Sequence, residues 1–281
     1  MAANFWTSAH RKLLVPRERL QGSHKADLEK GLSDNQLTQL QAYLILYIGD
    51  LAKASQQLVR QRVAATACTY FHRFYVKNNF CEHDPRIIAP ACLYLASKAE
   101  ESQIQAKVLF QMMKKLSARY HFMPILEMKQ LLDLEMVLLE ELDFHLVVFS
   151  PYHSLVKFLA DPKLAAMPAT TTKTGTMTLA ECCWAVLNDS YQTTICLTYA
   201  PHIIALACIS VAAALLHRDV TAWMLGLQAD LDQVFEVTLE ITLFFDRYGQ
   251  PISAEECRRP DLSQGCDARA RGGLRMFALT L

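Results

Sequence analysis

Apolar residues recur along most of the chain at the three- and four-residue spacing that places them on one face of a helix. This spacing predicts five helices in each half of the sequence. We expect them at residues 34–52, 58–77, 85–99, 107–117 and 125–142, and again at residues 151–159, 179–193, 201–216, 220–225 and 228–248. No run of alternating apolar and polar residues lies between hairpin-type turns, so strands are not expected. The pattern predicts an all-α fold.

Two of the predicted helices carry clear start signals. Asp84 is followed by Pro85, and these residue types suit the N-cap and the first helical position. Ser33 and Gln36 have the spacing of a capping box, in which each residue satisfies a backbone N–H of the other. These pairs predict helix starts near residues 34 and 85.

The two halves of the chain are related by a sequence repeat. Residues 85–92 (Pro-Arg-Ile-Ile-Ala-Pro-Ala-Cys) return at residues 201–208 as Pro-His-Ile-Ile-Ala-Leu-Ala-Cys, a shift of 116 positions. A tyrosine lies ten residues before each proline, at Tyr75 and Tyr191. A unit of about 100 residues is the size of a small domain, whereas solenoid repeats recur every 20–50 residues. We therefore expect two tandem copies of one five-helix domain.

Shifts in composition divide the chain further. Residues 161–177 contain two prolines, a glycine and a run of threonines, which predicts an exposed linker or loop. Helical periodicity ends at residue 249, so residues 249–281 are expected to form a flexible tail. The predicted organisation is an N-terminal helical segment at 1–33, a first unit at 34–145, and a second unit that starts at 146–160 and continues at 178–248.

Composition and charge narrow the class of partner. The 281 residues are 52% hydrophobic and 20% charged, which suits a globular protein. Lys plus Arg and Asp plus Glu both number 28, and this balance argues against a nucleic-acid-binding protein, which usually needs a basic excess. The longest apolar run, residues 203–216, is shorter than the roughly 18–20 residues that span a bilayer. We expect a protein partner and no direct contact with nucleic acid or membrane.

The cysteines argue against a metal site or a disulfide framework. They number nine, include no C-x-x-C pair and mostly occupy apolar positions of helices, as is typical of a reducing compartment. Cys68 and His72 have the spacing of half a metal site, but no second pair accompanies them. We interpret Cys68 as a core residue beside a surface His72, and we expect neither a metal nor a cofactor.

A charged cluster occurs in the first copy of the repeat alone. Lys98, Glu100 and Glu101 follow its buried stripe, whereas the second copy has alanines and leucines at residues 212–216. Lys98 falls at the margin of that stripe, and Glu135 projects within about 40° of the apolar stripe of its own helix. The two charges could form a salt bridge within the chain, or they could bind a helix end of a partner. Glu100 and Glu101 by default form a solvated helix end.

A second candidate surface lies on the predicted helix 179–193. Trp184, Asn188 and Tyr191 project together, away from the arc that faces the core. With Asp189, and with Trp6 beside them, they would form an aromatic and amide ridge suited to docking a protein. The alternative is that Trp184 packs under the connection between the units.

The residues around Lys98 resemble a known family. Residues 95–101 (Leu-Ala-Ser-Lys-Ala-Glu-Glu), with Leu134-Glu135 on a later helix and a degenerate second copy, resemble the cyclin box, a five-helix fold that occurs twice in cyclins. The resemblance is closest to C-type cyclins, and it extends over about residues 1–248. The motifs that carry it are Asn4-Phe5-Trp6, Asp84-Pro85, Ile88-Ala89-Pro90-Ala91-Cys92, Asn188-Asp189-Ser190-Tyr191 and Ile204-Ala205-Leu206-Ala207-Cys208.

The resemblance implies a nuclear, non-catalytic subunit that activates the Mediator-associated cyclin-dependent kinase. It implies that Lys98 and Glu135 bind the mobile regulatory helix of the kinase, and that Glu100 and Glu101 are further kinase contacts. The kinase helix would then be held where its glutamate pairs with the ATP-orienting lysine. Our hypothesis for the ridge around Trp184 is that it receives another subunit of the Mediator kinase module.

Three rival interpretations make different demands on the sequence. An enzyme is disfavoured because the chain has no Gly-rich phosphate loop, kinase catalytic motif or H-E-x-x-H. A general transcription factor built on the same double box would need a zinc ribbon and a basic surface, and neither appears in the sequence. A cyclin of another transcriptional type, with a different kinase, remains open.

The substrate-docking motif of cell-cycle cyclins, Met-Arg-Ala-Ile-Leu, is not found in the first helix, so substrate recruitment through it is not expected.

Overall fold

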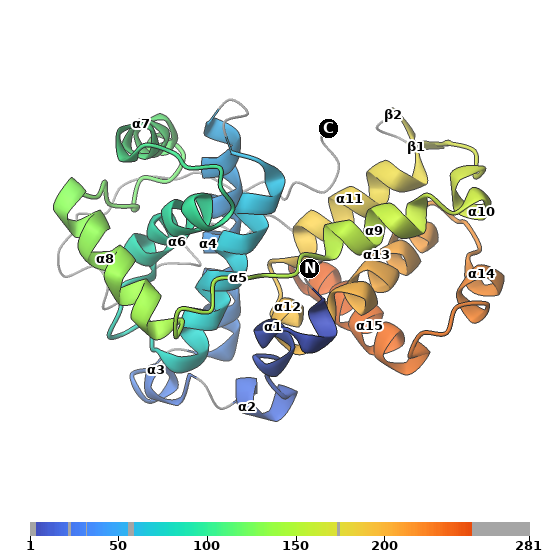
Figure 1. Ribbon diagram of the computed structural model, residues 1–281, viewed down its shortest axis with the longest axis horizontal. Helices are drawn as coiled ribbons and strands as arrows, with labels where there is room; N and C mark the ends of the chain where they lie inside the picture. The colour runs from blue at the N-terminus through green and yellow to red at the C-terminus, as the bar shows by residue number, and fades with distance from the viewer. Residues whose placement is uncertain (1–3, 22–23, 32, 56–58, 173–174, 249–281) are drawn as a thin grey trace. The chain divides into compact units, whose positions relative to one another are not determined.

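The computed structural model describes residues 4–21, 24–31, 33–55, 59–172 and 175–248. These residues form two compact units, which divide in the sequence between Val148 and Phe149 (Figure 1). The first unit contains η1 (Phe5–Thr7), α1 (Ala9–Lys12), α2 (Arg17–Gln21), α3 (Lys25–Glu29), α4 (Asp34–Ala54), α5 (Gln61–Lys77), α6 (Pro85–Ala99), α7 (Ala106–Leu116) and α8 (Met128–Glu141). The second contains α9 (Pro151–Leu159), α10 (Pro162–Ala165), β1 (Thr170–Thr172), β2 (Gly175–Met177), α11 (Leu179–Ser190), α12 (Ile195–Thr198), α13 (Pro201–Leu215), α14 (Thr221–Leu225) and α15 (Leu231–Tyr248).

The predicted all-α fold is confirmed, and each of the ten expected helices is present. The helices α6 and α9 have the predicted bounds, and most others differ by one to three residues at an end. The predicted helix 179–193 ends three residues early, at Ser190, and a separate short helix, α12, follows it. The predicted flexible tail at residues 249–281 lies outside the described residues. Within the described ranges, no helix is both long enough and apolar enough to cross a membrane.

The expectation of no strands is wrong at one place. Residues 170–172 and 175–177 pair as a short antiparallel hairpin inside the predicted linker, with Thr170 opposite Met177. Threonine is β-branched and favours extended backbone. The side chain of Arg218 donates to Thr170 Oγ1 at 3.1 and 3.2 Å and to the carbonyl oxygen of Pro168 at 3.2 Å, which ties the hairpin to the end of α13. The contact comes from a residue 48 positions away, so local periodicity gave no sign of it.

Each unit is built around one central helix. In the first unit α6 packs against α4, α5, α7 and α8, and in the second unit α13 packs against α9, α11, α12 and α15. Both central helices are buried on nearly every side. Their small residues, such as Ala89 and Ala205, let the neighbouring helices approach closely, because an alanine adds only a methyl group to the helix surface.

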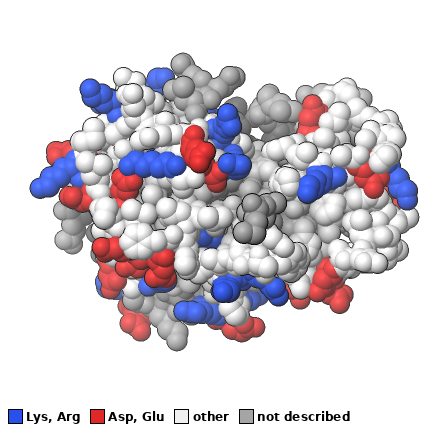
Figure 2. All heavy atoms as spheres, viewed as in Figure 1, with Lys and Arg blue, Asp and Glu red and all other residues white. Residues whose placement is uncertain are grey.

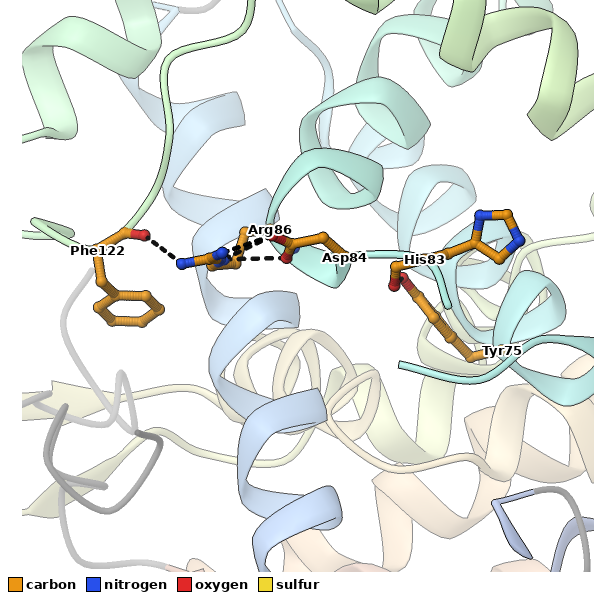
Figure 3. Close-up of polar contacts among 5 residues, drawn as sticks. All are labelled: Tyr75, His83, Asp84, Arg86 and Phe122. Atoms are coloured by element: carbon orange, nitrogen blue, oxygen red, sulfur yellow. Dashed lines mark hydrogen bonds and ion pairs between the residues drawn. The ribbon is translucent and has the colours of Figure 1, made fainter. Parts of the chain in front are cut away.

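The start of α6 is held by its predicted cap (Figure 3). The backbone N–H of Arg86 donates to Asp84 Oδ1 at 2.9 Å, and the guanidinium of Arg86 forms an ion pair with the same carboxylate at 2.6 Å. Arg86 also donates to the carbonyl oxygen of Phe122 at 3.4 Å. Just before this cap, Tyr75 Oη donates to the carbonyl oxygen of His83 at 2.9 Å, which fixes the turn between α5 and α6. The predicted capping box of Ser33 and Gln36 is also present.

The repeat extends to the ends of the two central helices. Glu101 and His217 have left-handed backbone conformations, with φ of 52° and 53°. After each of them the chain turns back onto its helix, since Ser102 N donates to Ser97 O at 2.9 Å and Arg218 N donates to Ala213 O at 2.8 Å. Glu101 and His217 are 116 positions apart, the same shift that relates Pro85 to Pro201. Both helices therefore end in a Schellman motif that uses a non-glycine residue.

A buried carboxylate ties the N-terminal segment to the first unit. Asp27, in α3, is fully buried and accepts backbone hydrogen bonds from Phe80 and Cys81, each at 3.0 Å. His24 Nδ1 lies 3.2 Å from Asp27 Oδ2. Burial by itself raises the pKa of Asp27, but hydrogen bonds from Cys81, Phe80 and His24 outweigh it and hold this pKa below its ordinary value. The short helix α3 is thereby fixed to the turn that precedes α6.

The interpretation of His72 as a surface residue is wrong. His72 is buried, as is Cys68, because α5 is enclosed along nearly its whole length between α4, α6 and α8. Among the described residues there is no group of three or more His, Cys, Asp or Glu side chains placed to hold a metal ion.

Candidate functional site

Lys98 and Glu135 meet at the surface of the first unit. Lys98 lies in the last turn of α6 and Glu135 near the middle of α8, and the packing of α6 against α8 brings them together. Lys98 Nζ lies 2.6 Å from Glu135 Oε1 and 2.8 Å from Oε2. The side chains are 30% and 13% exposed, respectively. The sequence left open whether this pair bonds within the chain, and in this structure it does.

Tyr94 provides a third part of this arrangement. It lies one turn before Lys98, and the ammonium of Lys98 is 4.4 Å from the centre of its ring, at cation–π distance. Burial lowers the pKa of Lys98, but the hydrogen bond and charge of Glu135, together with Tyr94, raise it above its ordinary value. Lys98 is therefore a fixed cation at neutral pH. A partly exposed ion pair contributes only about 0–1 kcal/mol to stability, so the fold does not depend on these charges.

Glu100 and Glu101 occupy different environments. Thr66 Oγ1 donates to Glu100 Oε1 at 2.8 Å, and Arg62 Nε lies 2.5 Å from Glu100 Oε2. Glu100 is only 12% exposed, so the expectation of a solvated side chain is wrong for it. Glu101 is exposed, as expected, and its left-handed backbone marks the end of α6. Of the two acids, Glu100 is thus held toward α5 and Glu101 faces solvent.

An apolar surface that the sequence reasoning missed lies beside the ion pair. Met128, Leu132 and Met136 are exposed and recur every four residues along α8, and we call them the α8 stripe. Glu135 is the chain neighbour of Met136, so the stripe runs past the ion pair. The sequence contained a sign of this surface, because α8 has apolar residues on two faces and only one face of a helix can pack against the core.

The predicted ridge on α11 is only partly exposed. Trp184 is half-buried and stacks on Tyr152 of α9, with ring centres 4.9 Å apart and planes 17° apart. Tyr152 Oη donates to Asn188 Oδ1 at 2.6 Å, and Asn188 is exposed. Asp189 and Tyr191 are buried, so the prediction that they lie outside the core is wrong. The helical projection could not include α9, which packs on α11 and brings Tyr152 against this face.

Trp6 belongs to the first unit and is 54% exposed. Its backbone N–H donates to Asn4 Oδ1 at 3.0 Å, and the guanidinium of Arg11 lies 5.2 Å from the centre of its ring. The short helix η1 thus presents a large aromatic side chain that has a cation on one face. Such a side chain suits a protein interface.

Comparison with known proteins identifies the family. The cyclin N-terminal domain model matches residues 17–147. Cyclin-C1-1 of rice is 40% identical over 251 residues, which cover 88% of this chain and 91% of the relative. Cyclin-C of rat is 31% identical over 255 residues and covers 88% of this chain and 85% of the relative. The chain is a C-type cyclin.

Solved structures share the fold of this cyclin. A chain of the yeast RNA polymerase II CTD kinase complex CTDK-1 matches 88% of this cyclin and 75% of its own length, with a TM-score of 0.63 and 18% identity. A chain of the yeast TFIIK complex matches 85% of this cyclin and 99% of its own length, with a TM-score of 0.61 and 20% identity. At these identities the likeness concerns the fold. Family membership implies a regulatory subunit rather than a catalyst.

The surface of the protein carries charges of both signs. Among the described residues on the face drawn in Figure 2, basic and acidic side chains are interspersed between wide uncharged areas. Such a surface favours a protein partner that meets apolar patches with a few placed charges. In this cyclin the Lys98–Glu135 pair beside the α8 stripe combines both features.

Proposed function

We propose that this cyclin is the regulatory subunit of the cyclin-dependent kinase of the Mediator kinase module, and that it regulates RNA polymerase II transcription in the nucleus. The observation that carries the proposal is the Lys98–Glu135 pair, held beside the exposed α8 stripe in the unit that matches the cyclin N-terminal domain. The similarity to proteins named cyclin-C, over most of their length, supports the choice of kinase.

The pair suits the end of a kinase helix. Backbone N–H groups at a helix start and carbonyl oxygens at a helix end have no partners within the helix. Lys98 has three donor hydrogens, and Glu135 can accept more hydrogen bonds than it receives from Lys98. The two residues can therefore bind such backbone groups while they remain paired with each other.

The α8 stripe supplies the apolar contact area. Its three side chains are exposed in the free cyclin, and burying them against a kinase helix is favourable at about 25 cal/mol per Å² of apolar surface. The charged pair orients the helix, and the stripe holds it. Because the cyclin binds one position of the mobile helix better than the others, it shifts the kinase population toward the active state. Glu101 is an additional contact at the rim, and Glu100 holds the end of α6 in place.

A second surface is proposed for another subunit of the kinase module. It consists of Trp184 and Asn188 on the second unit, whose side chains are at least partly exposed. Trp6 of the first unit is exposed as well and is proposed as a separate contact. Tyr191 belongs to the second surface as a buried support, because it lies beside Tyr152, on which Trp184 stacks. Asp189 is buried and is not part of the proposed surface. Trp184→Ala should weaken binding of that subunit and leave kinase binding unchanged. Unchanged binding of both partners would exclude this surface.

A cyclin of another transcriptional type, with a different kinase partner, is the second candidate. The observation that favours it is that the two structural relatives belong to other kinase complexes, the CTD kinase CTDK-1 and TFIIK. The two candidates differ in the kinase that this chain binds.

Co-purification with a panel of cyclin-dependent kinases, followed by a kinase assay, tests both candidates. We expect selective binding and activation of the Mediator kinase. Lys98→Glu with Glu135→Lys keeps an ion pair in the free cyclin but reverses the charges that the kinase meets. Kinase binding should therefore fall about 100-fold. This loss lies within the range of about 2–5 kcal/mol seen when an interfacial charge pair is broken. Lys107→Glu on α7 is the matched control, because Lys107 is exposed and lies on another helix.

Three results would contradict parts of this proposal. Unchanged kinase binding by the charge-reversed variant would remove Lys98 and Glu135 from the interface. Binding to a different kinase would leave the cyclin family intact and favour the second candidate. Equal loss of binding in Lys107→Glu would point to a general charge effect instead of a specific contact.

A further inference from the structure

The last helix of the second unit exposes an apolar stripe of its own. Phe235, Leu239 and Leu243 recur every four residues along α15 and are 68%, 47% and 57% exposed. We call them the α15 stripe. The opposite face of α15 is buried through Val234, Val237, Ile241 and Phe244. Three adjacent large apolar side chains on a solvent-facing helix mark a binding surface, because single exposed apolar residues are common but rows of them are not.

Acidic residues accompany this stripe. Asp232, Glu236, Glu240 and Asp246 lie on α15, and Arg247 is its one basic residue. The first three turns of the helix therefore carry three acids and no base. Glu236 accepts a hydrogen bond from Tyr199 Oη at 3.1 Å, which holds its charge next to Phe235. The α15 stripe thus suits a ligand that is both apolar and basic.

The chain that follows α15 contains a segment of that kind. Residues 268–281 read Ala-Arg-Ala-Arg-Gly-Gly-Leu-Arg-Met-Phe-Ala-Leu-Thr-Leu. They contain three arginines and no acid, and five of the last eight residues are leucine, methionine or phenylalanine. Both the charge and the apolar content complement the α15 stripe.

We propose that residues 269–281 bind the α15 stripe of the same molecule. The helix of 18 residues is about 27 Å long at 1.5 Å per residue. The 20 residues between Tyr248 and Arg269 can span up to about 65 Å, so the segment reaches any part of the stripe. A tethered segment also acts at an effective concentration of about millimolar, which favours it over a second copy of the chain.

In this arrangement the apolar residues of the segment cover Phe235, Leu239 and Leu243, and its arginines face the acids of α15. The segment keeps the stripe from acting as a self-association surface. The inference is independent of the kinase partner, because it concerns α15 and the chain that follows it.

Binding in trans tests the proposal directly. A fluorescently labelled peptide of residues 266–281 is titrated into this cyclin truncated after residue 250, and its anisotropy is measured. We expect saturable binding that weakens at least tenfold when Arg269, Arg271 and Arg275 are changed to Glu in the peptide, and that also weakens with added salt. The peptide variant leaves the folded protein untouched, so its effect cannot come from misfolding.

The protein variants locate the site. Changing Phe235, Leu239 and Leu243 to Ser should abolish peptide binding, whereas the matched triple Ser variant of the α8 stripe should retain it. The full-length chain should bind the peptide at least tenfold more weakly than the truncated chain, because its own segment competes. Circular dichroism verifies that each variant is folded.

Several results would overturn the proposal. They are no saturable peptide binding, equal binding by the α15-stripe variant, and equal binding by the full-length and truncated chains. Dimerisation of the full-length chain that is lost in the α15-stripe variant would show that a second copy covers the stripe instead.

Discussion

The central helices of the two units, α6 and α13, share their architecture and differ in their chemistry. Each has 15 residues, begins at a proline and ends before a residue in the left-handed conformation. Yet at the repeat shift of 116, Lys98 corresponds to Ala214, Tyr94 to Ser210 and Glu100 to Leu216. Leu216 is buried and apolar, whereas Glu100 is 12% exposed and paired with Arg62. The duplicated unit keeps the residues that the fold needs, and only the first copy has the charges that we propose a partner binds.

The last helices of the units repeat this lesson. Both α8 and α15 expose three apolar residues at four-residue spacing. The α8 stripe lies beside the Lys98–Glu135 pair, and the α15 stripe is accompanied by acids of its own helix. An exposed apolar stripe is therefore common to both units, and the neighbouring charges distinguish the ligands that we propose for them.

Substitutions in the shared core should have the largest effects and should be equal in the two units. Ile88 and Ile204 are equivalent positions and are both buried. We expect Ile88→Ala and Ile204→Ala each to lower the free energy of unfolding of its own unit by about 2–5 kcal/mol, through lost burial and the cavity left behind. Urea unfolding, followed by hydrogen exchange on peptides from each unit, measures this. An effect in one unit alone would break the equivalence of α6 and α13.

Asp27 should stabilise the first unit only. In Asp27→Asn an amide NH₂ group meets backbone N–H donors, which should lower the free energy of unfolding by about 1–3 kcal/mol. Because the pKa of Asp27 is lowered in the folded protein, the stabilisation is complete above the pKa of the unfolded chain, about 3.9, and is lost as pH falls through the folded pKa.

Urea unfolding at a series of pH values measures the effect of Asp27→Asn. Its difference from the wild type should shrink as the pH falls into the acid range. Asp133→Asn is the control, since Asp133 is exposed on α8. A difference that persists unchanged into acid would mean that the carboxylate charge of Asp27 does not matter.

The smallest expected effect concerns the ends of the central helices. Glu101 and His217 hold a conformation that L-residues adopt with strain. Glycine relieves that strain but loses more entropy on folding, so we expect Glu101→Gly and His217→Gly each to raise the free energy of unfolding by about 0.5–1 kcal/mol. Thermal unfolding checks both variants. A decrease in stability at either position would show that the side chain contributes more than its backbone strain removes.

The Lys98–Glu135 pair could be anticipated because both residues lie near the apolar stripes of their own helices. The α8 stripe could have been found as well, since α8 has apolar residues on two faces. The environment of Glu100 could not be predicted from the sequence, because its partners Arg62 and Thr66 lie more than 30 positions away on α5. The burial of Tyr191 has the same cause, since Tyr152 of α9 lies against this face of α11.

Local sequence by itself determined the bounds of α6 and α9, the caps of α4 and α6, and the duplication of the unit. These features depend on residues within one or two helical turns, or on direct repetition of the chain. Only the tertiary structure decided that Asp27 anchors α3, that His72 is buried and that Arg218 holds a threonine hairpin. Each of these depends on contacts between segments far apart in the sequence, which periodicity along one helix does not encode.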